Sequence, residues 1–196
     1  MDIINIGFIL QLFVLLNPLS SFSVLLSAYK QSYNIKLVAI EATVIAFLLA
    51  VAIIFLGPIL FSLYGISIDS FRIAGGIILL LLGIETVREA EEKEEKNANQ
   101  VDSFTSIIAT PLLTGPAVIS FLTIKIYELS PLVVLLNSFI SFFLVGLIFF
   151  AFATYVNKVN IKIISILSKV LGLFLTAVAI EMIAKGISAL FSLQKI

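Results

Sequence analysis

The stretch Asn17-Pro18-Leu19-Ser20-Ser21 interrupts a run from Ile3 to Ala28 that carries no charged residue. An uncharged run of this length is long enough to cross a bilayer as a helix. Pro18 removes a backbone donor and clashes with the preceding turn, so it frees a carbonyl where water cannot satisfy it. Asn17, Ser20 and Ser21 place hydrogen-bonding side chains at that break. The sequence therefore predicts a first membrane-spanning helix that is broken near its middle.

A second stretch, Thr110-Pro111-Leu112-Leu113-Thr114-Gly115-Pro116, repeats this pattern about halfway along the chain. Broken apolar segments at corresponding positions of two halves are typical of a transport site. The sequence thus predicts two proline-broken helices, the first and the fourth.

The composition is that of a protein embedded in a lipid bilayer. Of 196 residues, 61% are hydrophobic and 12% charged, and the mean hydropathy is +1.20. A soluble domain is closer to half apolar and a quarter charged. The net charge is zero, so there is no basic stripe of the kind that binds nucleic acid. Cysteine and histidine are absent, which argues against disulfides, thiol chemistry and zinc. We expect no cofactor and no metal.

Six apolar segments are expected, each close to the ~20 residues that a bilayer requires. They cover about residues 4–28, 35–58 with a short apolar tail, 71–87, 104–127, 131–155 and 163–191. Asn34 and Ser130-Pro131 are expected helix starts. Met1-Asp2-Ile3 resembles no cleavable leader, so the first segment is read as a retained helix. For the charged stretch 88–102, a solvated loop is favoured over a helical extension with Glu89/Lys93 pairing.

The two halves of the chain resemble each other. In the first and fourth segments, Pro18-Leu19 and Ser27 align with Pro111-Leu112 and Ser120. The third and sixth segments align without gaps, so that Gly76, Gly83, Glu85 and Ala90 match Gly172, Ala179, Glu181 and Gly186 in that order. Each half has an odd number of spans, so the second enters from the opposite side. The predicted fold is an all-α membrane protein of six transmembrane helices in a 3+3 inverted-topology repeat. It forms one domain, 1–196, with halves 1–90 and 104–196 and a charged linker 91–103.

Small residues form a stripe on the third and sixth segments: Gly76, Gly83, Gly172, Ala179 and Gly186. Small side chains let membrane helices approach closely. We interpret these residues as helix packing rather than as ligands.

The basic residues divide unequally between the two sides of the membrane. The side that holds the connections between spans one and two, three and four, and five and six has eight: Lys30, Lys36, Arg88, Lys93, Lys96, Lys158, Lys162 and Lys169. The other side has four: Arg72, Lys125, Lys185 and Lys195. Since cytoplasmic loops carry more lysine and arginine, both termini are predicted to lie outside.

Three motifs give the chain a family resemblance. They are Asn17-Pro18 followed by Ser-Phe-Ser-Val-Leu-Leu-Ser at 21–27, Phe-Arg-Ile-Ala-Gly-Gly at 71–76, and Thr-Pro-Leu-Leu-Thr-Gly-Pro-Ala-Val-Ile-Ser at 110–120. Over essentially its whole length the chain resembles the MarC family of six-span membrane proteins, which includes small neutral amino acid transporters. The resemblance implies a cytoplasmic-membrane location and glycine- or alanine-like substrates. Ser23 stands where such proteins usually carry a second proline, so the break at 110–116 is expected to be the more distorted, and Asn17 to matter more for its side chain.

A zwitterionic amino acid needs donors for its carboxylate and acceptors for its ammonium group. A broken helix offers free amides and free carbonyls at its two new ends. The predicted substrate-binding residues are Asn17, Pro18, Ser20, Ser21, Thr110, Pro111, Thr114, Gly115 and Pro116. The structural alternative is that the prolines only kink packed helices, while serine and threonine bond their own backbone.

Three carboxylates lie within or near the predicted spans. Glu181 is the preferred candidate for proton coupling, before Glu85 and Glu41. Arg88 follows Glu85 by three residues and Lys185 follows Glu181 by four, so interfacial ion pairs are the structural alternative.

The function that the sequence favours is secondary transport of small neutral amino acids or similar solutes, with proton or ion coupling as an option. The alternatives are export of another small metabolite and a non-transporting membrane scaffold or assembly protein. An enzyme is not expected, because no nucleophile, base or acidic pair stands out. The oligomeric state stays open.

Overall fold

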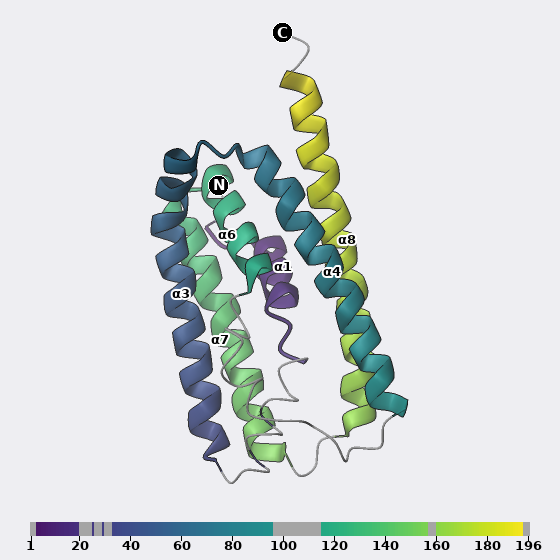
Figure 1. Ribbon diagram of the computed structural model, residues 1–196. Coiled ribbons are helices and arrows are strands. Elements are labelled where there is room, and N and C mark those ends of the chain that lie inside the picture. Colours follow the sequence, from purple (N-terminus) through teal and green to yellow (C-terminus); the bar gives the residue numbers. More distant parts are fainter. Residues whose placement is uncertain are drawn as a thin grey trace.

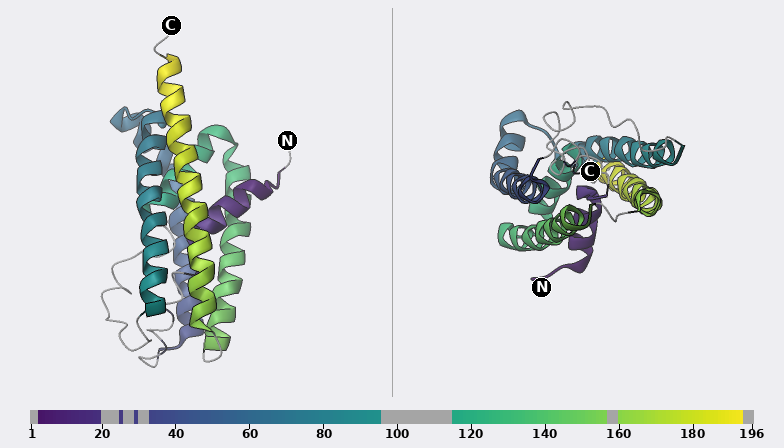
Figure 2. Two further views of the ribbon diagram at one scale, coloured as in Figure 1. Left: turned by 90° about the vertical axis from the view of Figure 1, so that its right-hand side faces the viewer. Right: turned by 90° about the horizontal axis from the view of Figure 1, so that it is seen from below.

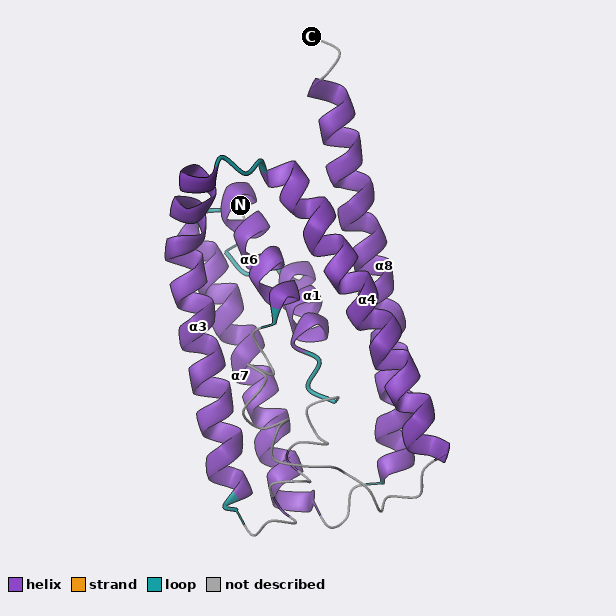
Figure 3. Ribbon diagram, in the orientation of Figure 1, coloured by secondary structure: helices purple, strands orange, loops and turns teal. Residues whose placement is uncertain are grey.

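The computed structural model of the chain describes residues 3–19, Leu25, Tyr29, 33–95, 115–156 and 160–193. Every regular element within these ranges is a helix (Figure 3). In chain order the helices are α1 (Ile6–Leu16), α3 (Ile35–Tyr64), α4 (Ile68–Glu95), α6 (Pro116–Glu128), α7 (Pro131–Tyr155) and α8 (Ile161–Leu193). The predicted all-α architecture is confirmed for the described part of the chain.

Four of these helices are long and apolar enough to cross a membrane: Ile35–Tyr64, Ile68–Arg88, Pro131–Tyr155 and Lys162–Ser192. Helices α1 and α6, with 11 and 13 residues, are shorter than the ~20 residues that a crossing needs. They are the described parts of the first and fourth predicted segments.

Local chemistry explains where the helices begin. The side chain of Asn34 accepts a hydrogen bond from the amide of Leu37 (3.4 Å), which caps α3 as expected. Ser130 precedes α7, and Pro131 occupies its first turn, where a missing amide costs nothing.

Two helix ends differ from the prediction. Helix α3 continues through Pro58 to Tyr64 and ends at Gly65, which takes the left-handed conformation (φ 63°) typical of a helix cap. Helix α4 continues to Glu95, so at least residues 88–95 are helix rather than the solvated loop that was favoured. The extension needs no new nucleus because it prolongs an existing helix, and its alanine, glutamate and lysine residues are strong helix formers.

The helices form two long pairs with the short helices between them. Helices α4 and α8 pack along their length as one antiparallel pair, and α3 and α7 form the other (Figures 1 and 2). Helices α1 and α6 lie between the pairs and contact each other. Helix α8 ends, and α1 begins, in the half of the bundle that holds the α3–α4 turn (Figures 1 and 2). Residues of α1, α6 and α7 contribute much of the core, for example Leu12, Leu122 and Phe142.

The small-residue stripe lies at the α4–α8 contact. A Cβ atom added to Gly83 would stand 3.0 Å from the carbonyl oxygen of Gly172, and one added to Gly172 would stand 3.0 Å from that of Gly83. At Gly76 and Gly186 the corresponding distances, to the carbonyl oxygens of Ala179 and Asp69, are 2.9 and 2.8 Å. The two backbones therefore approach as closely as glycine allows.

Candidate functional site

Helix α1 ends at Asn17, directly before Pro18. Asn17 has a φ of 43°, in the left-handed region, and its amide donates to the carbonyl of Val14 (3.1 Å). Asparagine adopts this conformation more readily than most residues, so it suits a helix end. The break falls inside the bundle, since Asn17 is only 7% exposed.

The side chain of Asn17 is held from α4. Its Nδ2 donates to Oγ1 of Thr86 (3.2 Å), and Thr86 in turn donates to the carbonyl of Leu82 (2.8 Å). Thr86 is 4% exposed. Oδ1 of Asn17 is buried and has no hydrogen-bond partner in the described part of the chain. The sequence analysis missed Thr86, whose only signal was a hydroxyl within an apolar span.

Helix α6 begins within the second proline-containing stretch, residues 110–116. Gly115 is its N-cap, with extended backbone (φ −70°, ψ 175°) and no capping side chain, and Pro116 occupies the first turn. The amide of Ala117 therefore has no acceptor within the helix. The amides of Val118 and Ile119 both donate to the carbonyl of Gly115 (3.0 and 3.2 Å), so the start of α6 presents the amide of Ala117 and the positive end of the helix dipole.

These two helix ends lie at the same level of the bundle. Helix α1 descends from the end that holds the chain termini, α6 ascends toward it, and α1 ends where α6 begins, near mid-height (Figures 1 and 2). Above this level the rings of Phe8 and Phe121 meet edge to face, with 5.2 Å between centroids. The carbonyl end of α1 and the amide end of α6 thus lie at one level of the bundle and are reached from opposite directions.

The other predicted site residues fall into two groups. Pro18 is buried beside Asn17. Ser20, Ser21, Thr110, Pro111 and Thr114 lie outside the described residues, as does Ser23. Which of the two breaks is more distorted therefore stays a prediction.

The three candidate carboxylates lie on exposed positions. Glu41 and Glu85 are exposed on α3 and α4. The side chain of Glu181 is 56% exposed and accepts from Lys185 (2.7 Å), as their spacing of four residues predicts. Glu85 directly precedes Thr86, the partner of Asn17, but its own side chain is on the exposed side of α4.

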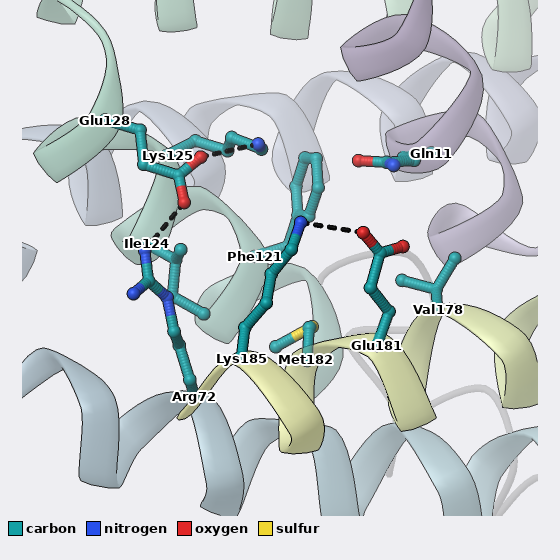
Figure 4. A pocket seen from close by; sticks show the side chains of 10 residues that line it. All are labelled: Gln11, Arg72, Phe121, Ile124, Lys125, Glu128, Val178, Glu181, Met182 and Lys185. Atoms are coloured by element: carbon teal, nitrogen blue, oxygen red, sulfur yellow. Dashed lines mark hydrogen bonds and ion pairs between the residues drawn. The ribbon is translucent and has the colours of Figure 1, made fainter. Parts of the chain in front are cut away.

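A cluster of ion pairs joins α4 to α6 near the chain termini (Figure 4). Arg72 donates to Asp69 (2.9 Å) and to Glu128 (2.7 Å), and Lys125 donates to the second oxygen of Glu128 (2.7 Å). Burial by itself raises the pKa of Glu128, but the hydrogen bonds and charges of Lys125 and Arg72 outweigh it and hold the pKa below its ordinary value. Arg72 and Glu128 are 56 positions apart, so no local spacing pointed to this cluster.

Asn137 of α7 anchors the start of α1. Its Oδ1 accepts from the amide of Asn5 (2.8 Å), and its Nδ2 donates to the carbonyls of Ile3 (2.9 Å) and Val133 (2.7 Å). Asn137 is fully buried. Asn5 itself caps α1 by accepting from the amide of Phe8 (2.9 Å). The position of the short helix is therefore set by a polar contact that the sequence analysis did not single out.

Comparisons with known proteins agree with the resemblance seen in the motifs. The profile described as "MarC family integral membrane protein" matches residues 3–191. The UPF0056 membrane protein MJ1677 of Methanocaldococcus jannaschii is 32% identical over 190 residues, covering 90% of this chain and 92% of its own. The UPF0056 membrane protein YhcE of Escherichia coli is 32% identical over 200 residues, with coverage of 94% and 92%. No solved structure gives a significant match. The chain is a member of the MarC family of integral, multi-pass membrane proteins.

Proposed function

We propose that this protein is a secondary transporter that moves small neutral amino acids, such as glycine and alanine, across the cytoplasmic membrane. The observation that carries the proposal is that two oppositely directed helices end at one level of the bundle, α1 at Asn17 and α6 at its start, Gly115 (Figure 1). Broken helices whose ends meet near the middle of the membrane form the substrate sites of many secondary transporters.

The chemistry of the two ends suits a zwitterion. The amide of Ala117, which has no acceptor within α6, is a donor for a carboxylate, and the positive helix end favours its charge. The last carbonyls of α1 and the unpartnered Oδ1 of Asn17 are acceptors for an ammonium group. Among the residues that the structure describes, no atom lies within 4 Å of a Cβ added at Gly115, which leaves room for a small ligand to approach the backbone there.

The proposed architecture is the 3+3 inverted repeat with proline-broken first and fourth helices. What supports it is the direction of the described helices: α4 and α8 are antiparallel, as are α3 and α7 (Figure 1). Such a repeat lets one half rock against the other and open the central site to each side in turn. Both termini are proposed to lie outside.

Asn17→Gly is expected to weaken transport while leaving the fold intact. Glycine adopts a positive φ freely, so α1 still ends in place, but the side-chain acceptor for the ammonium group is lost. A hydrogen bond to a charged group contributes about 1.5–3 kcal/mol, so we expect a roughly 10–100-fold loss of transport efficiency. Uptake of labelled glycine and alanine into proteoliposomes measures it.

Thr86→Val tests the same site from α4, because it removes the acceptor for Nδ2 of Asn17 without changing the shape of the side chain. Thr154→Val is the matched control: the hydroxyl of Thr154 is exposed on α7 and bonds only the carbonyl of Phe150 (2.8 Å). If the Asn17→Gly and Thr86→Val proteins both take up substrate at the wild-type rate, the proposed central site is wrong. If the wild-type protein itself takes up no substrate, the non-transporting scaffold is favoured.

Glu181 is the proposed proton-coupling residue. Glu181→Gln keeps the size of the side chain but cannot release a proton, so glycine uptake should lose its dependence on an imposed pH gradient. Uptake with and without the gradient is compared in the same vesicles. The coupling proposal fails if the Gln variant responds to the gradient as the wild type does.

A further inference from the structure

A cavity lies beside the ion pairs that join α4 to α6. It has a volume of about 60 Å³ and is bordered by α1, α4, α6 and α8 (Figure 4). Since a water molecule needs about 10–15 Å³ on this measure, the cavity has room for a ligand of a few heavy atoms. Gln11 on its wall is six residues before Asn17, about 9 Å along α1 at 1.5 Å per residue.

The walls of the cavity carry both signs of charge. Arg72, Lys125 and Lys185 are basic, and Glu128 and Glu181 are acidic. Both oxygens of Glu128 are already engaged, by Arg72 and Lys125. Glu181 uses only Oε1, for Lys185, in the ion pairs of this cluster.

Unused hydrogen-bonding capacity therefore remains on opposite walls. Each lysine ammonium has three donors, and one of them is taken at Lys125 by Glu128 and one at Lys185 by Glu181. The carboxamide of Gln11 points toward the space between these groups and offers both a donor and an acceptor (Figure 4). Phe121, Val178 and Met182 supply an apolar side.

We propose that this cavity is an access subsite that binds the same small zwitterionic amino acid before or after it occupies the central site. The free oxygen of Glu181 accepts from the ligand's ammonium group, and Lys125 and Lys185 donate to its carboxylate. Gln11 bonds either end. An isolated anion would leave the second oxygen of Glu181 unused, and an isolated cation would leave the remaining lysine donors unused, so the mixed lining favours a molecule that carries both charges. This inference rests on the proposed transport function.

The test is equilibrium binding of radiolabelled glycine to the full chain in lipid nanodiscs. It is carried out with Asn17→Gly as the background, which weakens the central site. Glu181→Gln, Lys185→Gln and Gln11→Leu are added singly, with Lys162→Gln, an exposed lysine at the far end of α8, as the matched control. Acetate and methylammonium serve as competitors that carry only one of the two charges.

We expect glycine to bind the Asn17→Gly protein. Adding Glu181→Gln or Lys185→Gln should each raise the Kd for glycine by about tenfold or more, because each substitution removes one charge-assisted hydrogen bond. Gln11→Leu should raise it less, and Lys162→Gln not at all. Acetate and methylammonium should compete at least about tenfold more weakly than glycine.

Three results would overturn the subsite: no glycine binding to Asn17→Gly, unchanged Kd in both charge variants, or acetate competing as well as glycine. If the wild type transports glycine in that case, the transport function stands and only the subsite is lost. If the wild type transports no glycine, the proposed function is wrong. In that case, glycine binding that depends on Glu181 would still support the subsite. If glycine binding does not depend on Glu181 either, the subsite is wrong as well.

Discussion

Gly83→Leu is expected to separate α4 from α8 and to leave little folded protein. A Cβ at this position would lie 2.7 Å from Cγ2 of Thr176 and 3.0 Å from the carbonyl oxygen of Gly172. The threonine methyl group could move, but the backbone oxygen could not move without shifting the whole helix. Overpacking a tight contact costs about 1–3 kcal/mol, so Gly83→Ala should already lower stability by this amount and leucine by more.

The measurement is the temperature at which half of the purified protein is lost from the monodisperse peak after heating in detergent. Gly115→Ala is the matched control, since its Cβ would meet nothing within 4 Å and its φ of −70° suits any residue. Adding Thr176→Ser to Gly83→Ala removes the methyl contact but keeps the hydroxyl bond to Leu173. It should restore only part of the stability. A Gly83→Leu protein as stable as the wild type would show that the helices do not pack this closely.

Asn137→Leu is expected to destabilise the protein by about 2–4 kcal/mol and to loosen the start of α1. The substitution keeps the volume of the side chain but leaves the amide of Asn5 and the carbonyl of Ile3 without their partner. A buried polar group without a partner costs about 1–3 kcal/mol. Ile3 is 60% exposed and Asn5 is exposed as well, so water reaches both groups and each contributes at the lower end of this range.

Ser138→Ala is the control for this prediction. Ser138 is the next residue of α7 and equally buried, but its hydroxyl has no partner in the part of the chain that the structure describes. Removing an unpaired buried hydroxyl should leave stability unchanged or raise it. Hydrogen exchange of the α1 amides should accelerate in Asn137→Leu and not in Ser138→Ala. Equal effects of the two variants would mean that burial, rather than the link to α1, decides the role of Asn137.

Sequence reasoning located the places where helices begin and end when the signal was local. Proline and the residue before it restrict the backbone in their immediate neighbourhood, so Asn17-Pro18 and Gly115-Pro116 could be read as helix boundaries without a structure. It failed where two local signals competed. At Pro58 the helix continued, and at residues 88–95 helix propensity prevailed over the expectation that a run of charges is a loop.

The central site could be predicted only in part. Asn17 stood out because it precedes a proline in an apolar run. Its partner Thr86 did not, because the two residues are 69 positions apart and many hydroxyls occur within the spans. The same limit applies to Asn137, which reaches Asn5 across 132 positions.

By itself the sequence determined that the chain is helical, that it is embedded in a membrane, and where its backbone is interrupted. Each of these follows from hydropathy and from the restricted geometry of proline, which act within a few residues. The tertiary structure alone decided which helices pair, which side chain holds Asn17, and that charges from α4, α6 and α8 gather around one cavity. Helices that are apolar all round carry no stripe to mark the face that meets a partner rather than lipid. Their pairing depends on how closely two backbones approach, which is a property of both helices together.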